Sequence, residues 1–181
     1  RNQDGRWLSG VFSGGNGSNS DLSNGVASAN NINSQIINNE YVNIRQGVHV
    51  NSNTNSNRIT NLLISRNRMV STVDSQKPDM GIYVNNVSDF RIENNIIDGI
   101  RHLNTGSSNI YGMNILNGLN YTIVGNQILN FSHPSNNMIG AAMYIQGNST
   151  SNATITRNII RNIKNSGGGN VRGIDVNIST S

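Results

Sequence analysis

The feature that most constrains the fold of this chain is a phrase that occurs twice in succession between Gly81 and Phe131. Each copy opens with a glycine and a short alternating apolar stretch, and continues as apolar-x-Ile-x-x-Asn-x-Ile-x-x-apolar. The opening glycines are Gly81 and Gly112, and each precedes the Asn of its copy by 14 residues. A constant offset indicates a structural period, and repeats of this length are typical of solenoids and arrays.

The same pattern extends over most of the chain. The Asn recurs at intervals of 28 to 32 residues, at Asn39, Asn67, Asn95, Asn126 and Asn158. The opening strand recurs at similar intervals, at Gly47, Gly81, Gly112, Ala142 and Gly173. Each period contains three short apolar segments without helical spacing. We name them strand A (glycine, apolar, x, apolar), strand B (before the Asn) and strand C (from the Asn onward).

Three strands per period predict that each period forms one coil of a β-solenoid. Coils stacked about 4.8 Å apart pair each strand with its neighbours and close a continuous Ile/Val core. We therefore predict an all-β parallel β-helix of about five coils, with the five Asn residues as an internal ladder. Asn suits a recurring bend because it tolerates left-handed backbone angles and its amide bonds along the stack. The solenoid is expected over residues 31–181, with residues 1–30 as an irregular or partial first coil.

The repeat also resembles that of a known group. Gly81–Val84 and Ile92–Ile97, with their counterparts at 112–128 and 142–160, are similar to the repeat of right-handed parallel β-helix proteins of the pectate-lyase-like superfamily. The resemblance covers residues 32 to 177 and implies a right-handed winding. It does not select one function, because the group includes polysaccharide lyases, hydrolases, epimerases, phage tailspikes, adhesins and surface-layer fibres.

Composition narrows the choice of partners. The chain has no Cys, so neither disulfides nor thiolate metal sites are available. No apolar run approaches the roughly 18 residues of a membrane-spanning helix, so no membrane span is expected. The net charge of +4 comes from thinly spread Lys and Arg, and only 5% of residues are aromatic, which does not favour a nucleic-acid partner.

The outward face of strand A is the first candidate binding surface. The residue after each glycine is expected to point into the core, so the next one points out. Two outward columns follow: His49, Tyr83, Asn114, Tyr144 and Asp175, and then Asn51, Asn85, Leu116, Gln146 and Asn177. Tyr rings offer flat apolar faces to pyranoses, and amides supply donors and acceptors, so we expect a polysaccharide or cell-surface glycan here. The alternative is that these are ordinary surface residues of a β-helix.

A second candidate site lies seven residues after each ladder Asn, where strand C leads into a loop of variable length. This column reads Gln46, Asp74, His102, His133 and Asn165. Asp74, His102 and His133, with Arg101 beside them, would form a catalytic cluster, because His titrates near neutral pH and serves as a general base. Arg45, Arg101 and Lys164, each one position earlier, would also neutralise an acidic sugar. Unequal loop lengths favour the alternative of a plain polar turn.

The resembled calcium-dependent lyases gather several carboxylates on the groove face, with an Arg base nearby. Here the strand A column supplies only Asp175, and Asp74 and Asp79 lie in a loop. We therefore expect no metal site and no cofactor. Calcium is the one ion that the resemblance would bring, and no carboxylate cluster supports it.

Neither end of the sequence shows a segment that would cap an open solenoid. Uncapped coils offer unpaired strand edges to other chains, so we expect self-association or a section of a longer solenoid. The predicted function is an extracellular, cell-surface or virion-surface β-helix that acts as a structural or adhesive fibre scaffold and contacts glycans through strand A. The alternative is a polysaccharide lyase or glycoside hydrolase, similar to a phage tailspike, with its groove along the same face. The missing carboxylate cluster favours binding over catalysis.

Overall fold

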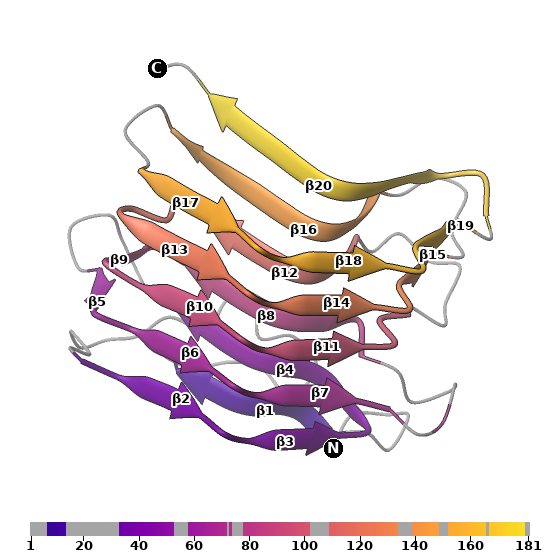
Figure 1. Cartoon of the computed structure of the whole chain (residues 1–181), viewed down its shortest axis with the longest axis horizontal. Coiled ribbons are helices and arrows are strands. Elements are labelled where there is room, and N and C mark those ends of the chain that lie inside the picture. The colour runs from indigo at the N-terminus through magenta and orange to yellow at the C-terminus, as the bar shows by residue number, and fades with distance from the viewer. Residues whose placement is uncertain are drawn as a thin grey trace.

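The computed structural model describes residues 7–13, 33–52, 58–71, 73, 78–101, 109–133, 139–148, 152–165 and 167–179. Within these ranges every regular element is a β-strand, and the strands stack in parallel into three sheets that enclose one core (Figure 1). The predicted all-β solenoid is therefore confirmed. Within residues 1–30, Trp7–Ser13 forms a strand paired with the first strand A, and the rest of that segment lies outside the described residues.

Each of the three strands predicted per period builds one sheet. Sheet A has six strands in the order β1 (Trp7–Ser13), β4 (Ile44–Asn51), β8 (Met80–Asn85), β12 (Ile110–Leu116), β16 (Ile139–Asn148) and β20 (Asn170–Ser179). Sheet B has five: β2 (Gln35–Ile37), β6 (Leu63–Ser65), β10 (Arg91–Glu93), β13 (Tyr121–Val124) and β17 (Ala153–Thr156). Sheet C has five: β3 (Glu40–Val42), β7 (Arg68–Val70), β11 (Ile96–Asp98), β14 (Gln127–Leu129) and β18 (Ile159–Arg161).

Two small sheets lie at the corners of the coil. They pair β5 (Ile59–Thr60) with β9 (Val87–Ser88), and β15 (Ser132–His133) with β19 (Lys164–Asn165). The five layers of sheets B and C are separated by four steps of parallel pairing, which corresponds to about four turns of solenoid. In Figure 1 the chain runs left to right through the near sheets, returns right to left through sheet A behind them, and rises by one layer per circuit. This winding is right-handed, as the resemblance implied.

The register agrees with the alignment of the repeats. Ile92 pairs with Ile64 below and Ile123 above, and Tyr83 pairs with His49 and Asn114. The residue after the opening Gly or Ala of strand A is buried in the core in four coils, because Val48, Ile82, Met113 and Met143 are 0 to 1% exposed, whereas Ile174 in the last layer is 50% exposed. Sheets B and C close the same core with Ile64, Ile92, Ile97, Ile123 and Ile128.

The five repeated Asn residues form a continuous hydrogen-bonded ladder inside the bend between sheets B and C. The Nδ2 of Asn95 donates to Asn126 Oδ1 at 2.9 Å and to the Ile64 carbonyl at 2.9 Å, and its backbone N–H also donates to Asn126 Oδ1. The same bonds link Asn39 to Asn67, Asn67 to Asn95 and Asn126 to Asn158. Each side chain thus satisfies backbone groups that the bend removes from the sheets.

We expected each ladder Asn to have a positive, left-handed φ angle. In the structure the residue before the ladder Asn has this angle instead. Asn38, Arg66, Asn94 and Arg157 have φ of 54 to 57°, and Gly125 has φ of 68°. The sequence interpretation assigned both tasks, the left-handed angle and the amide bond, to one residue, and the structure divides them between two. The division is physically reasonable, because a left-handed residue faces its side chain away from the bend while the next one points inward.

Glycine recurs in strand A because the chains approach closely there. A Cβ at Gly81 would lie 2.6 Å from the Gly112 carbonyl oxygen and 2.7 Å from Ile97 Cγ2. A Cβ at Gly47 or Gly112 would come similarly close to neighbouring atoms. A Cβ at Gly173 in the last coil would lie 3.9 Å from its nearest neighbour. The glycine column therefore lets sheet A approach the side chains of sheet C.

Replacing a ladder residue is expected to be costly. Asn95→Ala leaves the backbone N–H of Asn67 and the Ile64 carbonyl without their partners in a fully buried bend, so we expect a loss of at least about 2 kcal/mol in the free energy of unfolding. Urea denaturation measures this loss. Asn152→Ala, which removes one exposed amide bond to Asn120, serves as the control and should cost about 0.5 kcal/mol or less. Equal losses in the two variants would contradict the structural role of the ladder.

The glycine column gives a second prediction with an internal control. Gly81→Ala places a methyl group against backbone and Ile97, and we expect it to destabilise the chain by about 1–3 kcal/mol. Gly173→Ala adds the same group where space is open and should change stability by about 0.5 kcal/mol or less. Thermal unfolding of both variants tests the difference. If Gly81→Ala unfolds at the same temperature as Gly173→Ala, the close approach of sheet A to sheet C does not require a glycine.

Candidate functional site

The outer face of sheet A brings the predicted columns together as expected, but it is less exposed than the sequence indicates. His49, Tyr83, Asn114, Tyr144 and Asp175 align on five consecutive strands. His49 is 2% exposed and Asn114 is 6% exposed, while the two Tyr residues and Asp175 are half-buried.

The first part of this face is a stack of two rings. The His49 and Tyr83 rings lie 4.4 Å apart between centroids, with an angle of 18° between their planes. His49 Nδ1 lies 3.1 Å from Gln46 Oε1, so the imidazole is held from the side as well as from the layer above. The stack leaves the Tyr83 ring as the half-exposed member.

The second part is a cluster around Tyr111 and Tyr144. Their ring centroids are 5.0 Å apart, and the Tyr144 hydroxyl donates to Gln146 Oε1 at 3.2 Å. Asp175, beside Tyr144 on the next strand, pairs with Arg172 at 2.5 Å. Burial raises the pKa of Tyr111 above its ordinary value of 10.0; the nearby Tyr144 and Asp175 add to the rise, and a hydrogen bond with Asn109 opposes it.

Sequence reasoning missed Tyr111 as a member of this face. The prediction started strand A at the glycine, and Tyr111 comes just before Gly112. In the structure the strand begins earlier, and Tyr111 lies in register with Met80 and Ala141. A signal was present, because Tyr111 is the only Tyr that directly precedes the opening residue of strand A among the five copies.

Amides form the border of the face. Asn85 Nδ2 donates to Asn51 Oδ1 at 2.9 Å, and Asn117 Nδ2 donates to Asn85 Oδ1 at 3.3 Å. Gln146 is exposed, and Asn51 is 3% exposed. Among the described residues, the carboxamide oxygen of Asn114 is buried without a hydrogen-bond partner. The face thus combines two ring stacks and an amide border.

The structure describes two of the four predicted catalytic residues, His133 and Arg101. Asp74 and His102 lie outside the described residues. His133 in β15 is fully buried, and a Cβ at Gly140 would lie 2.7 Å from its Cδ2, so the imidazole is packed against strand A. Arg101 pairs with Ser132, and Ser132 with Lys164, which puts the two cations on alternate layers of one corner.

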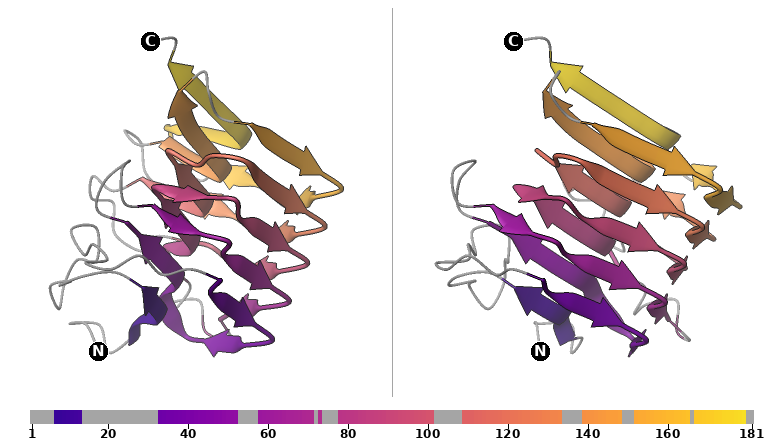
Figure 2. Two further views of the ribbon diagram at one scale, coloured as in Figure 1. Left: turned by 90° about the vertical axis from the view of Figure 1, so that its left-hand side faces the viewer. Right: turned by 60° about the vertical axis from the view of Figure 1, so that its left-hand side comes forward.

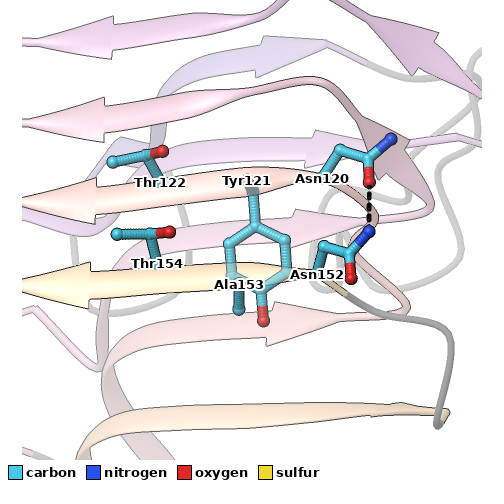
Figure 3. Close-up of a pocket in the computed structure, with 6 residues that line it drawn as sticks. All are labelled: Asn120, Tyr121, Thr122, Asn152, Ala153 and Thr154. Atoms are coloured by element: carbon cyan, nitrogen blue, oxygen red, sulfur yellow. Dashed lines mark hydrogen bonds between the residues drawn. The ribbon is translucent and has the colours of Figure 1, made fainter.

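Two surface depressions lie at the corners of the coil. One, of about 420 Å³, is lined by Arg101, Lys164, Ser132, Phe131, Asn130 and Asn162. The other, of about 490 Å³, is lined by Asn120, Tyr121, Thr122, Asn152, Ala153 and Thr154. Figure 3 shows the Tyr121 ring lying over Ala153, where a large residue in one layer meets a small one in the next, beside the amide bond between Asn152 and Asn120.

The described part of the chain holds no group of three or more His, Asp or Glu side chains that would bind a metal ion. Asp79 is instead paired with Arg45 at 2.7 Å. Among the same residues no helix occurs that would cross a membrane.

No protein-family model, curated protein or solved structure matches the chain. The class that the geometry defines is a parallel β-solenoid with an internal Asn ladder.

The buried tyrosines predict a loss of stability at high pH. Burial raises the pKa of Tyr41, Tyr111 and Tyr121 above 10.0, so the unfolded chain releases these protons first. Their contribution to stability is present below about pH 10 and is lost as pH rises through the folded-state pKa. Thermal unfolding midpoints measured from pH 8 upward should fall above pH 10, and the fall should be smaller in Tyr111→Phe. An unchanged slope in that variant would contradict the assignment.

Proposed function

We propose that this chain is an extracellular β-helix scaffold, at a cell or virion surface, that binds glycans through the outer face of sheet A. The observation that carries the proposal is the pair of ring stacks on that face, Tyr83 on His49 and Tyr144 on Tyr111. A ring that is already stacked on a ring of the neighbouring layer is held in one orientation. It therefore offers its free face or edge to a sugar without losing much side-chain entropy.

The spacing of the two stacks supports an extended ligand. Tyr83 and Tyr144 lie on β8 and β16, which are separated by one strand, so their layers are about 10 Å apart. One layer rises by about 4.8 Å, close to the length of one pyranose in an extended glycan. A glycan lying along the solenoid axis would place alternate sugars on the two rings, with Asn85 and Gln146 beside them as hydrogen-bonding groups.

The charges of the face favour a neutral glycan. In the three outward columns that contain Tyr111, Tyr144 and Gln146, the charged side chains are Arg172 and Asp175, and they pair with each other. A polyuronate would meet no excess of positive charge there. This differs from the acidic substrates of the resembled lyases, and it supports a role in adhesion or structure within the pectate-lyase-like group.

The enzyme alternative, a polysaccharide lyase or glycoside hydrolase, has less support. Its described candidates are His133, which is fully buried, and Arg101, which lies at the corner depression rather than on the aromatic face. A catalytic base must lie within hydrogen-bond reach of its substrate. The proposal therefore treats binding without turnover as the activity of this face.

Binding to neutral polysaccharides such as cellulose, xylan and mannan, and to polygalacturonate, tests the proposal by affinity electrophoresis. We expect retention by at least one neutral polysaccharide, with little dependence on salt. Tyr144→Ala should weaken that binding about 3- to 10-fold, since one aromatic contact contributes about 0.5–1.5 kcal/mol. Thr122→Ala, on the outer face of sheet B, is the control and should bind as the original chain does.

The same incubations are assayed for new reducing ends and for unsaturated products. Release of either would favour the enzyme alternative, and loss of that release in His133→Ala with the fold intact would place the buried imidazole in its chemistry. Binding that Tyr144→Ala and Thr122→Ala reduce equally would locate the glycan away from sheet A.

A further inference from the structure

Two cations and a hydroxyl form one column at the corner that follows sheet C. Arg101 pairs with Ser132, and Ser132 pairs with Lys164, so these three residues lie on successive layers. Each comes three positions after the end of its sheet C strand, β11, β14 or β18. Figures 1 and 2 show the layers stacked one above the other, so this basic column runs along the side of the solenoid.

The three residues of the basic column also line the corner depression of about 420 Å³. Asn130 and Asn162 border the same depression, and Asn162 Nδ2 donates to Asn130 Oδ1 at 3.0 Å. Asn130 Nδ2 in turn donates to Asp98 Oδ1 at 2.7 Å. The depression is therefore bordered by an amide column that hydrogen bonds fix in place and by the basic column.

The described residues that line this depression carry an excess of positive charge. Within the described part of the chain, no carboxylate pairs with Lys164, and no side-chain hydrogen bond engages the Ser132 hydroxyl. Asp98, the described carboxylate nearest to the column in sequence, already accepts an amide hydrogen bond and does not line the depression. Arg45, in contrast, is paired with Asp79 at 2.7 Å.

We propose that this depression is a binding site for a tetrahedral oxyanion, a phosphate or a sulfate. Arg101 and Lys164 are two layers apart, which places their backbones about 10 Å from each other. Both have long side chains, and Ser132 lies between them. An anion over Ser132 is then bound by the guanidinium from one layer, by the ammonium from the other and by the hydroxyl in the middle.

The number of acceptor oxygens favours a tetrahedral anion over a carboxylate. A carboxylate has two oxygens in one plane, and the planar fork of an Arg engages both of them. A phosphate has additional strong acceptor oxygens that point to other sides, so it can engage Lys164 and Ser132 as well as Arg101. Two cations also match the charge of about −1.5 to −2 that a phosphate group carries at pH 7.

This site goes beyond the proposed glycan contact and differs from it in place and in chemistry. The aromatic rings of Tyr83 and Tyr144 lie on the outer face of sheet A, whereas the depression lies at the corner after sheet C. The ring face suits a neutral ligand and the depression suits an anionic one. Binding to the depression should therefore weaken as salt is added, because exposed charges are screened.

A titration of the full chain with inorganic phosphate at pH 7, followed by ¹H–¹⁵N NMR at constant ionic strength set with NaCl, tests the proposal. We expect saturable shifts at the amides of Ser132 and Lys164. Lys164→Glu should weaken the binding at least about tenfold, because it replaces an attracting charge with a repelling one. Arg157→Glu makes the same change in net charge at an exposed Arg of the same layer and is the matched control, with affinity within about twofold of the original chain.

Ser132→Ala tests whether the site is defined by hydrogen bonding, since it leaves every charge in place. We expect about 3- to 10-fold weaker binding, which corresponds to the loss of one hydrogen bond. Circular dichroism of the variants shows whether the fold is kept.

A parallel titration with glycerol 3-phosphate identifies the source of the anion. Binding as tight as that of inorganic phosphate indicates a phosphorylated molecule, and binding more than about tenfold weaker indicates the free ion. Shifts that do not saturate, or equal weakening by Lys164→Glu and Arg157→Glu, would overturn the proposal. Lys164→Glu should retain the binding of neutral polysaccharides, so a failure of this site is distinguishable from a failure of the proposed function.

Discussion

The structure depends on a side-chain amide that bonds to the layers above and below it. Where sheets B and C meet, the chain turns and its backbone groups leave the sheet ladders. Asn95 supplies the missing partners, since it donates to Asn126 and to the Ile64 carbonyl and accepts from Asn67. An unsatisfied buried polar group costs about 1–3 kcal/mol, so a bend without this Asn would be unfavourable in every coil. No layer is complete by itself, which is why the repeat must be stacked to be stable.

This dependence explains why the sequence predicts the fold well. A ladder tolerates no slip, because moving Asn95 by one residue would turn its amide out of the core and break the bonds to two layers. The Asn spacing therefore determined the register of sheets B and C in advance, and the glycine spacing did the same for sheet A. The left-handed φ angle was assigned one residue too late, because Asn suits both a left-handed angle and an amide ladder. The structure shows that Asn94 has the left-handed angle and that Asn95 makes the ladder bonds.

The candidate site was predictable as a set of columns but not as a surface. Alternation identifies which residues face outward, and Tyr83 and Tyr144 do face outward. It does not show that His49 lies beneath Tyr83, because such contacts depend on side-chain rotamers in two layers. Tyr111 was missed because β12 begins at Ile110, two residues before the glycine at which the prediction started strand A. Asp74 and His102 were placed by counting through loops of unequal length, where equal offsets do not define equal positions.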